Sequence, residues 1–174
     1  HYSDELIDST ELLGNEKKIF IEETQLSKDE WKNKFVLDAG CGMGRFTKIA
    51  LELGAEVVAI DLSESVERAK ILLDNYPKLH LIQCDLLNLP FKKQVFDIVY
   101  SQGVIHHTPD AKKAFQNLSN LVKPGGILTV WVYGKAGRYK DFKSNLFKPE
   151  RQHLKRYIFL VWLIVLIRGI ISNI

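Results

Sequence analysis

The feature that most constrains this chain is a glycine-rich turn between two apolar patterns, Phe35-Val-Leu-Asp-Ala-Gly-Cys-Gly-Met-Gly-Arg-Phe-Thr47. Its first three residues are apolar, as is typical of a strand buried on both faces of a sheet. Glycine then occupies every second position from Gly40 to Gly44. From Phe46 onward, apolar residues recur with the period of a helix. The pattern predicts a strand, a turn that accepts positive φ angles, and a helix whose first N–H groups face a ligand.

Two kinds of nucleotide cofactor bind to such a unit. The dinucleotide fingerprint G-x-G-x-x-G needs its third glycine so that the helix can pack on the strand. Arg45 stands at that position here, and the spacing is G-x-G-x-G. A nicotinamide-dependent oxidoreductase therefore stays only as an alternative interpretation.

Four further apolar runs alternate with segments of helical period, which predicts a mostly parallel α/β sheet of Rossmann type with helices on both faces. The runs are 57–60, 79–84, 96–100 and 127–132. In such sheets the ligand lies at the carboxyl ends of the strands. The residues that leave these ends, and that we expect to face one site, are 38–44, 61–62, 85–86 and 101–107.

Two aspartates follow expected strands at informative places. Asp61 lies 21 residues after Gly40, where a carboxylate can accept hydrogen bonds from a ribose diol. Asp85 follows the third run, where it is either a turn residue or an acceptor for an adenine amino group, with Leu86 packed on the ring.

Five motifs in order resemble those of the class I S-adenosylmethionine-dependent methyltransferases, in particular the small-molecule branch with the ubiquinone and menaquinone biosynthesis enzymes. They are Val-Leu-Asp-Ala-Gly-Cys-Gly-Met-Gly, Val-Val-Ala-Ile-Asp-Leu-Ser, Gln-Cys-Asp-Leu-Leu-Asn-Leu-Pro-Phe, Phe-Asp-Ile-Val-Tyr-Ser-Gln-Gly-Val-Ile-His-His and Val-Lys-Pro-Gly-Gly. The resemblance implies S-adenosyl-L-methionine as cofactor and a methyl group transferred to oxygen, nitrogen or carbon. It implies cofactor binding by Ala39, Gly40, Cys41, Gly42, Asp61, Leu62, Asp85, Leu86 and Gln102. Within that set, 40–42 would line the methionine moiety, Asp61 the ribose and 85–86 the adenine.

Methyl transfer from a sulfonium requires positioning and no metal, so we expect no metal site. A base helps when the acceptor must lose a proton. His106 is the catalytic candidate, and His107 the alternative, because adjacent side chains are expected to diverge. Cys41 is interpreted as a small residue at the cofactor, the alternative being a thiol whose pKa is lowered by the helix. A cofactor-binding module without methyl-transfer activity is a further alternative.

The distribution of charge and the number of cysteines indicate the class of binding partner and the redox setting of the protein. Residues 1–134 carry a net charge of −4 and residues 135–174 one of +7. An acidic body does not suit nucleic acid, so a small-molecule acceptor, hydrophobic or anionic, is expected. The two cysteines lie far apart in the sequence and indicate a reducing, cytoplasmic setting.

We expect three parts: an N-terminal helical flank (1–34), the cofactor-binding core (35–134) and a basic, then apolar, helical segment (135–174). Ser27 and Glu30 have the spacing of a capping box, and the flank either covers the sheet or forms a flap. The sequence after residue 132 shows no pattern for the last two strands of the resembled fold, so we expect a truncated or unusual end. For the last segment, a membrane-spanning helix lacks length and a peripheral membrane helix lacks alternating charge. We interpret it as a lid over the site or the interface of a homodimer.

Overall fold

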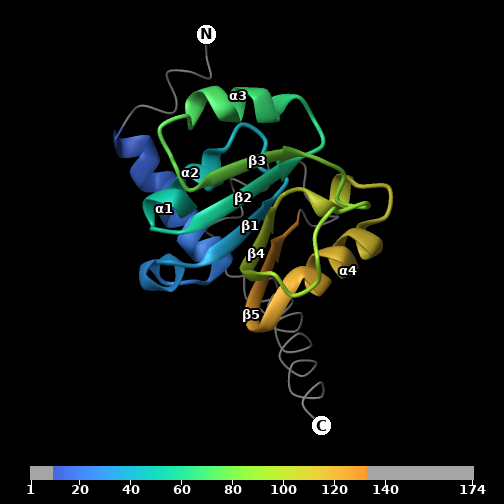
Figure 1. Ribbon diagram of the computed structural model, residues 1–174. Coiled ribbons are helices and arrows are strands. Elements are labelled where there is room, and N and C mark those ends of the chain that lie inside the picture. Colours follow the sequence, from blue (N-terminus) through green and yellow to red (C-terminus); the bar gives the residue numbers. More distant parts are fainter. Residues whose placement is uncertain (1–9, 133–174) are drawn as a thin grey trace, which may run out of the picture. The chain divides into compact units, whose positions relative to one another are not determined.

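The computed structural model describes the backbone of residues 10–132 and side chains from residue 14 onward. Its centre is a five-stranded sheet, parallel throughout, with the strand order β3-β2-β1-β4-β5 (Figure 1). The strands are β1 (Phe35–Ala39), β2 (Glu56–Asp61), β3 (Leu79–Gln83), β4 (Phe96–Gln102) and β5 (Val122–Trp131). The strand order reverses between β1 and β4, so this pair marks the topological switch point.

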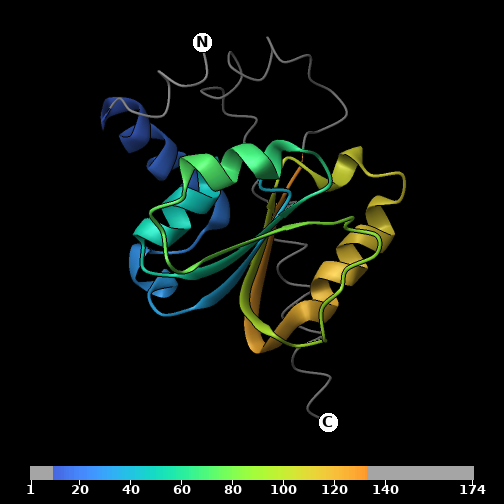
Figure 2. The same ribbon diagram turned by 45° about the horizontal axis from the view of Figure 1, so that its top comes forward.

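Helices lie on both sides of the sheet, as the alternating pattern predicts. They are α1 (Thr10–Thr24), α2 (Arg45–Glu52), α3 (Ser65–Leu72) and α4 (Ala111–Leu121), with the 3₁₀ turns η1 (Lys28–Trp31) and η2 (Ile105–His107). Figure 2 shows α1 and α2 on one side of the sheet and α4 on the other. None of the helices between residues 10 and 132 has the length and hydropathy that crossing a bilayer requires.

Each strand sends alternate side chains into two hydrophobic layers. Val36 joins the layer beneath α1 and α2, whereas its neighbour Leu37 joins the layer beneath α4. Both side chains are fully buried. This two-sided burial is the reason that the strands read as continuous apolar runs.

The N-terminal flank covers the sheet through an aromatic cluster. Phe20 of α1 is fully buried and its ring lies 4.8 Å from Trp31 and 5.2 Å from Tyr100 of β4. At η1 the Glu30 carboxylate accepts hydrogen bonds from the Ser27 backbone N–H and hydroxyl, at 2.7 and 2.8 Å. The predicted capping pair is thus present, and it begins a single 3₁₀ turn.

The fifth strand begins earlier than the sequence indicates. The structure assigns β5 to Val122–Trp131, with a register shift where residues 123–126 bulge out opposite the start of β4. Gly125 has φ +76°, as position i+2 of the predicted type II turn requires. The turn therefore lies within the paired strand. The predicted lid or interface and the question of the last two strands fall on residues 133–174, outside the described part.

Candidate functional site

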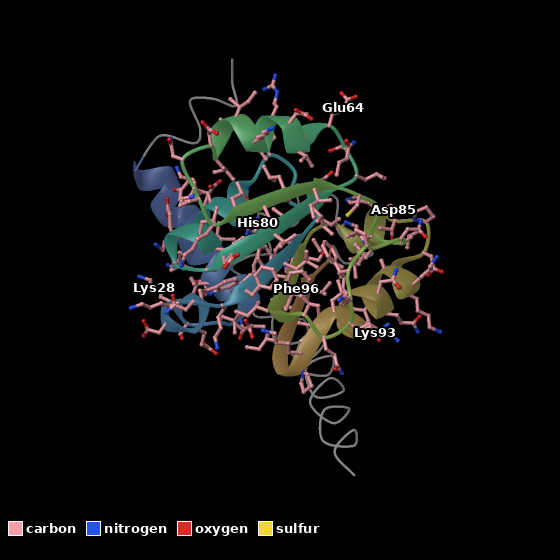
Figure 3. All side chains as sticks on the ribbon, in the orientation of Figure 1. Lys28, Glu64, His80, Asp85, Lys93 and Phe96 are labelled. Carbon is pink, nitrogen blue, oxygen red and sulfur yellow. The ribbon has the colours of Figure 1, made fainter. Side chains whose placement is uncertain are left out.

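The carboxyl edge of the sheet brings together the four groups of residues that the sequence places at strand ends. The register pairs Ala39 with Ile60, Asp61 with Gln83, and Asp38 with Tyr100. The glycine turn, the β2–α3 turn and η2 therefore start at one level of neighbouring strands. In Figure 3 the labelled Glu64 and Asp85 lie toward this end of the strands, and Lys28 and Lys93 toward the other.

The glycine turn is docked on the end of β2 by its own backbone. The N–H groups of Gly40 and Cys41 both donate to the Ile60 carbonyl, at 2.8 and 2.9 Å. The next N–H, that of Gly42, donates to Asp61 Oδ2 at 2.8 Å. No side chain caps α2, whose N-cap residue is Gly44. The loop is thus held in place without using the first N–H groups of α2.

The three glycines of the turn all have positive φ angles, but different surroundings. A Cβ on Gly40 would lie 2.5 Å from Val104 Cγ1, and one on Gly44 would lie 2.6 Å from Leu73 Cδ1. At Gly42 a Cβ would meet no atom of the described residues within 4 Å. Gly40 and Gly44 are therefore required by packing against η2 and α3. Gly42 has open space in front of it that a ligand can use.

Asp61 links the two turns at this edge. Its Oδ2 receives the Gly42 N–H, and its Oδ1 receives the backbone N–H and the hydroxyl of Ser63, at 2.9 and 2.7 Å. The carboxylate therefore ties the glycine turn to the β2–α3 turn, beside Gly42. The adjacent Leu62 side chain is 68% exposed, which leaves an apolar surface beside it.

Asp85 acts first as a turn residue. Its carboxylate accepts from the Leu87 N–H at 2.8 Å and from the Asn88 amide at 3.3 Å. Leu86 is 6% exposed and packs in the layer beneath α4, and its carbonyl accepts from the Asn117 amide at 2.9 Å. Leu62 therefore offers more apolar surface at this edge than Leu86 does.

Gln102 ends β4 next to Gly103, which has φ +73°. Its side-chain nitrogen and oxygen are both buried, and neither makes a hydrogen bond with any described residue. Buried amides normally find partners, so this pair suits a ligand that offers both a donor and an acceptor.

His106 lies in η2, two residues after the Val104 side chain that packs on Gly40. Burial, and then the neighbouring His107, lower the pKa of His106. The imidazole is therefore neutral at pH 7 and able to accept a proton. The expectation that the two histidines diverge is wrong, because the 3₁₀ turn brings their ring centroids to 4.0 Å.

Cys41 is 8% exposed, and burial, followed by the Asp38 and Asp61 charges, raises the pKa of its thiol. The alternative of a thiol activated by the helix is thus wrong. Ala39 is fully buried, and its carbonyl accepts from the Ser101 hydroxyl at 2.8 Å, which ties β1 to β4.

Sequence reasoning missed a polar cluster directly beneath the turn. Asp38 is 3% exposed and accepts from the Thr47 hydroxyl at 2.6 Å. The Tyr100 hydroxyl lies in the same cluster without meeting the geometry of a full hydrogen bond to any described residue. Burial raises the pKa of Asp38 to about 7, although the Thr47 hydrogen bond opposes this. The signal was an aspartate within an otherwise apolar strand.

The described residues at this edge leave room and hydrogen-bonding groups for a small polar ligand. Open space at Gly42, the Gln102 amide without a described partner and a carboxylate held between two turns lie together at this edge and leave polar groups for a ligand. No lysine or arginine among residues 10–132 forms an ion pair with Asp38, Asp61 or Asp85. The described residues also hold no group of three potential metal ligands.

Comparison with known proteins gives a consistent result. Residues 37–130 match the family model described as a methyltransferase domain. The chain is 36% identical over 99 residues to a ubiquinone biosynthesis O-methyltransferase of Coxiella burnetii, covering 56% of this chain and 42% of that protein. It is 35% identical over 94 residues to a malonyl-[acyl-carrier protein] O-methyltransferase of Salmonella typhimurium, covering 53% and 36%.

A solved structure of an S-adenosylmethionine dependent methyltransferase from Mesorhizobium loti superposes with a TM-score of 0.55 at 29% identity, covering 61% of this chain and 48% of that one. The chain thus spans less than half the length of the two curated relatives.

Proposed function

The chain belongs to the methyltransferase domain family, and from this premise we propose that it binds S-adenosylmethionine at the carboxyl edge and methylates a small molecule. The observation that carries the proposal is the Gly42–Asp61 pair, in which open space lies beside an oriented carboxylate. The bound cofactor supplies a methyl group on a sulfonium, which leaves as a neutral thioether.

The residues of this chain have separate roles in the proposal. Asp61 accepts hydrogen bonds from the ribose hydroxyls, and the exposed Leu62 side chain supplies an apolar surface for the adenine. Asp85 and Leu86 shape the neighbouring turn through the hydrogen bonds of their backbone and carboxylate. The turn 40–42 and the Gln102 amide contact the methionine moiety.

His106 is the proposed base for acceptors that must lose a proton. Its lowered pKa keeps the imidazole neutral at pH 7, so it can take a proton from a hydroxyl group. The acceptor we propose is a hydrophobic or anionic small molecule, and the two relatives named above as O-methyltransferases support an oxygen atom as its target. We place the protein in the cytoplasm, where its two free cysteines stay reduced.

Calorimetry with S-adenosylhomocysteine tests the assignment of Asp61. In Asp61→Ala the affinity should fall by roughly tenfold to hundredfold, since a hydrogen bond to a charged group contributes about 1.5–3 kcal/mol. Asp74→Asn, an exposed change outside the site, is the matched control and should bind as the wild type does.

Equal affinity in Asp61→Ala and wild type would contradict the assignment of Asp61. Thermal stabilisation by NAD and none by S-adenosylhomocysteine would instead support an oxidoreductase. If the protein binds the cofactor but methylates no acceptor in a broad screen, the result would support a cofactor-binding module without methyl-transfer activity.

A further inference from the structure

The Asp61 carboxylate is nearly saturated with hydrogen bonds from its own chain. A carboxylate offers about four acceptor positions on its two oxygens. Three are in use: Gly42 N–H on Oδ2, and the Ser63 N–H and hydroxyl on Oδ1. Among the described residues no donor takes the fourth position, whereas a ribose diol brings two hydroxyl donors.

Only one of these three donors can leave without moving the backbone. The N–H groups of Gly42 and Ser63 are fixed by the turns that contain them. The Ser63 hydroxyl rotates about a single bond, and its residue is exposed to water. Its oxygen also accepts from the Ser65 N–H at 3.3 Å, so it keeps a role at the start of α3 after leaving Asp61.

We propose that the Ser63 hydroxyl occupies the acceptor position that the second ribose hydroxyl needs, and that a ligand with a vicinal diol displaces it. This inference rests on the proposed function and adds a residue that sets the affinity for the diol. Ser63 stabilises the free form of the site and competes with the ligand for Oδ1. A ligand with one ribose hydroxyl uses the open position and leaves Ser63 in place.

The test compares two ligands and three proteins by calorimetry. The ligands are S-adenosylhomocysteine and its 2′-deoxy analogue, which keeps one ribose hydroxyl. The proteins are wild type, Ser63→Ala and Ser63→Thr, the last of which retains the hydroxyl. Ser63→Ala should bind S-adenosylhomocysteine roughly threefold to tenfold more tightly than wild type, the range expected for one competing hydrogen bond.

The 2′-deoxy analogue should bind wild type and Ser63→Ala equally, and Ser63→Thr should resemble wild type with both ligands. The free Ser63→Ala protein should melt a few degrees lower than wild type, because it loses the hydroxyl's hydrogen bonds with Asp61 and with the Ser65 N–H. At saturating S-adenosylhomocysteine this difference should shrink to the part caused by the lost Ser65 contact, and the cooperative transition also shows that the variant folds.

Unchanged or weaker binding of S-adenosylhomocysteine by Ser63→Ala would overturn the competition. A gain of equal size with both ligands would also overturn it, since the analogue does not need the second position. Failure of the proposed function gives a different pattern, in which wild type does not bind S-adenosylhomocysteine or Asp61→Ala binds it as well as wild type. That result would overturn both proposals.

Discussion

At the amino edge of the sheet, a carboxylate is matched by a cation. Asp97 accepts from the Lys123 ammonium at 2.9 Å and from the Phe35 N–H at 2.8 Å. Burial alone would raise the pKa of Asp97, but these hydrogen bonds outweigh it and lower that pKa. At the carboxyl edge, Asp38 is more deeply buried, and among the described residues its partners are the neutral hydroxyls of Thr47, which donates at 2.6 Å, and Tyr100, which lies beside it. Its pKa is raised to about 7.

The difference between the two edges indicates where a ligand is needed. The Asp97 carboxylate needs no charge from a ligand, because Lys123 of the same chain supplies its positive partner. At the carboxyl edge, the aspartates at 38, 61 and 85 have no lysine or arginine partner among residues 10–132. Of these three, Asp38 is buried and the other two are half-buried, and a buried negative charge is costly until it is paired. A ligand that carries a sulfonium and an ammonium group would supply the missing positive charge.

The largest expected effect comes from adding a methyl group at each edge. Gly40→Ala puts a Cβ 2.5 Å from Val104 Cγ1 at φ +94°, and Gly126→Ala puts one 2.7 Å from the Asp97 carbonyl oxygen. Overpacking and, at Gly40, a strained φ should lower the free energy of unfolding by roughly 2–6 kcal/mol for Gly40→Ala and about 1–3 kcal/mol for Gly126→Ala.

Urea denaturation measures these losses, and calorimetry measures the affinity for S-adenosylhomocysteine. Only Gly40→Ala should also weaken ligand binding, because its clash lies in the proposed site. Weakened binding by a folded Gly126→Ala protein would contradict the separation of the two edges.

The next effect is a pH dependence of stability with opposite signs at the two edges. The pKa of Asp38 is raised to about 7 from 3.8, so the stability it contributes is full below pH 4 and is lost as the pH rises through 7. The loss amounts to roughly 4 kcal/mol at most, at about 1.4 kcal/mol per pKa unit. Asp97, whose pKa is lowered, contributes stability above its unfolded pKa, which is lost as the pH falls below about 4.

Denaturant titrations of the free protein from pH 3 to 8 can separate these windows. Asp38→Asn should remove the decrease in stability between pH 4 and 7 and leave the acid limb intact. If Asp38→Asn keeps the full decrease, the assignment of that limb to Asp38 is wrong.

The smallest expected effect is the removal of the amino-edge cation. Lys123→Met should lower the free energy of unfolding by about 0.5–1 kcal/mol, since the Lys123 and Asp97 side chains are 42% and 28% exposed and water screens their interaction. Affinity for S-adenosylhomocysteine should stay unchanged, with Lys112→Met, an exposed change on α4, as the control. A clear change in the affinity of Lys123→Met for S-adenosylhomocysteine would contradict the separation of the two edges.

Most of the fold could be predicted because strands buried on both faces and amphipathic helices leave clear periods in the sequence. The pattern around Val36 and Leu37 predicted a strand with two buried faces, and both side chains are fully buried. The extension of β5 through Gly125 could not be predicted. A turn signal in the sequence does not tell whether the residues before it still pair with β4, and that pairing depends on contacts distant in sequence.

The sequence predicted which residues lie at the carboxyl edge, but it did not predict the contacts that hold them there. Spacing indicated Gly40 and its positive φ, but the second reason for glycine there is Val104, more than 60 residues later in the chain. The prediction that Leu86 packs on the adenine ring says nothing of its place in the layer beneath α4, where Asn117 binds its carbonyl. Both outcomes depend on contacts between distant segments, which spacing alone does not reveal.

The contact between Gly40 and Val104 also has a practical consequence for redesign. Segments that choose the acceptor could be exchanged between related enzymes to obtain new products. The Val104 side chain packs against Gly40, where there is no Cβ, so Val104 should be kept with the glycine turn when the segment after it is exchanged. A chimera should therefore join its two parent sequences after Val104. A junction before Val104 would place at this position a side chain from the other parent, which packs against a different glycine turn.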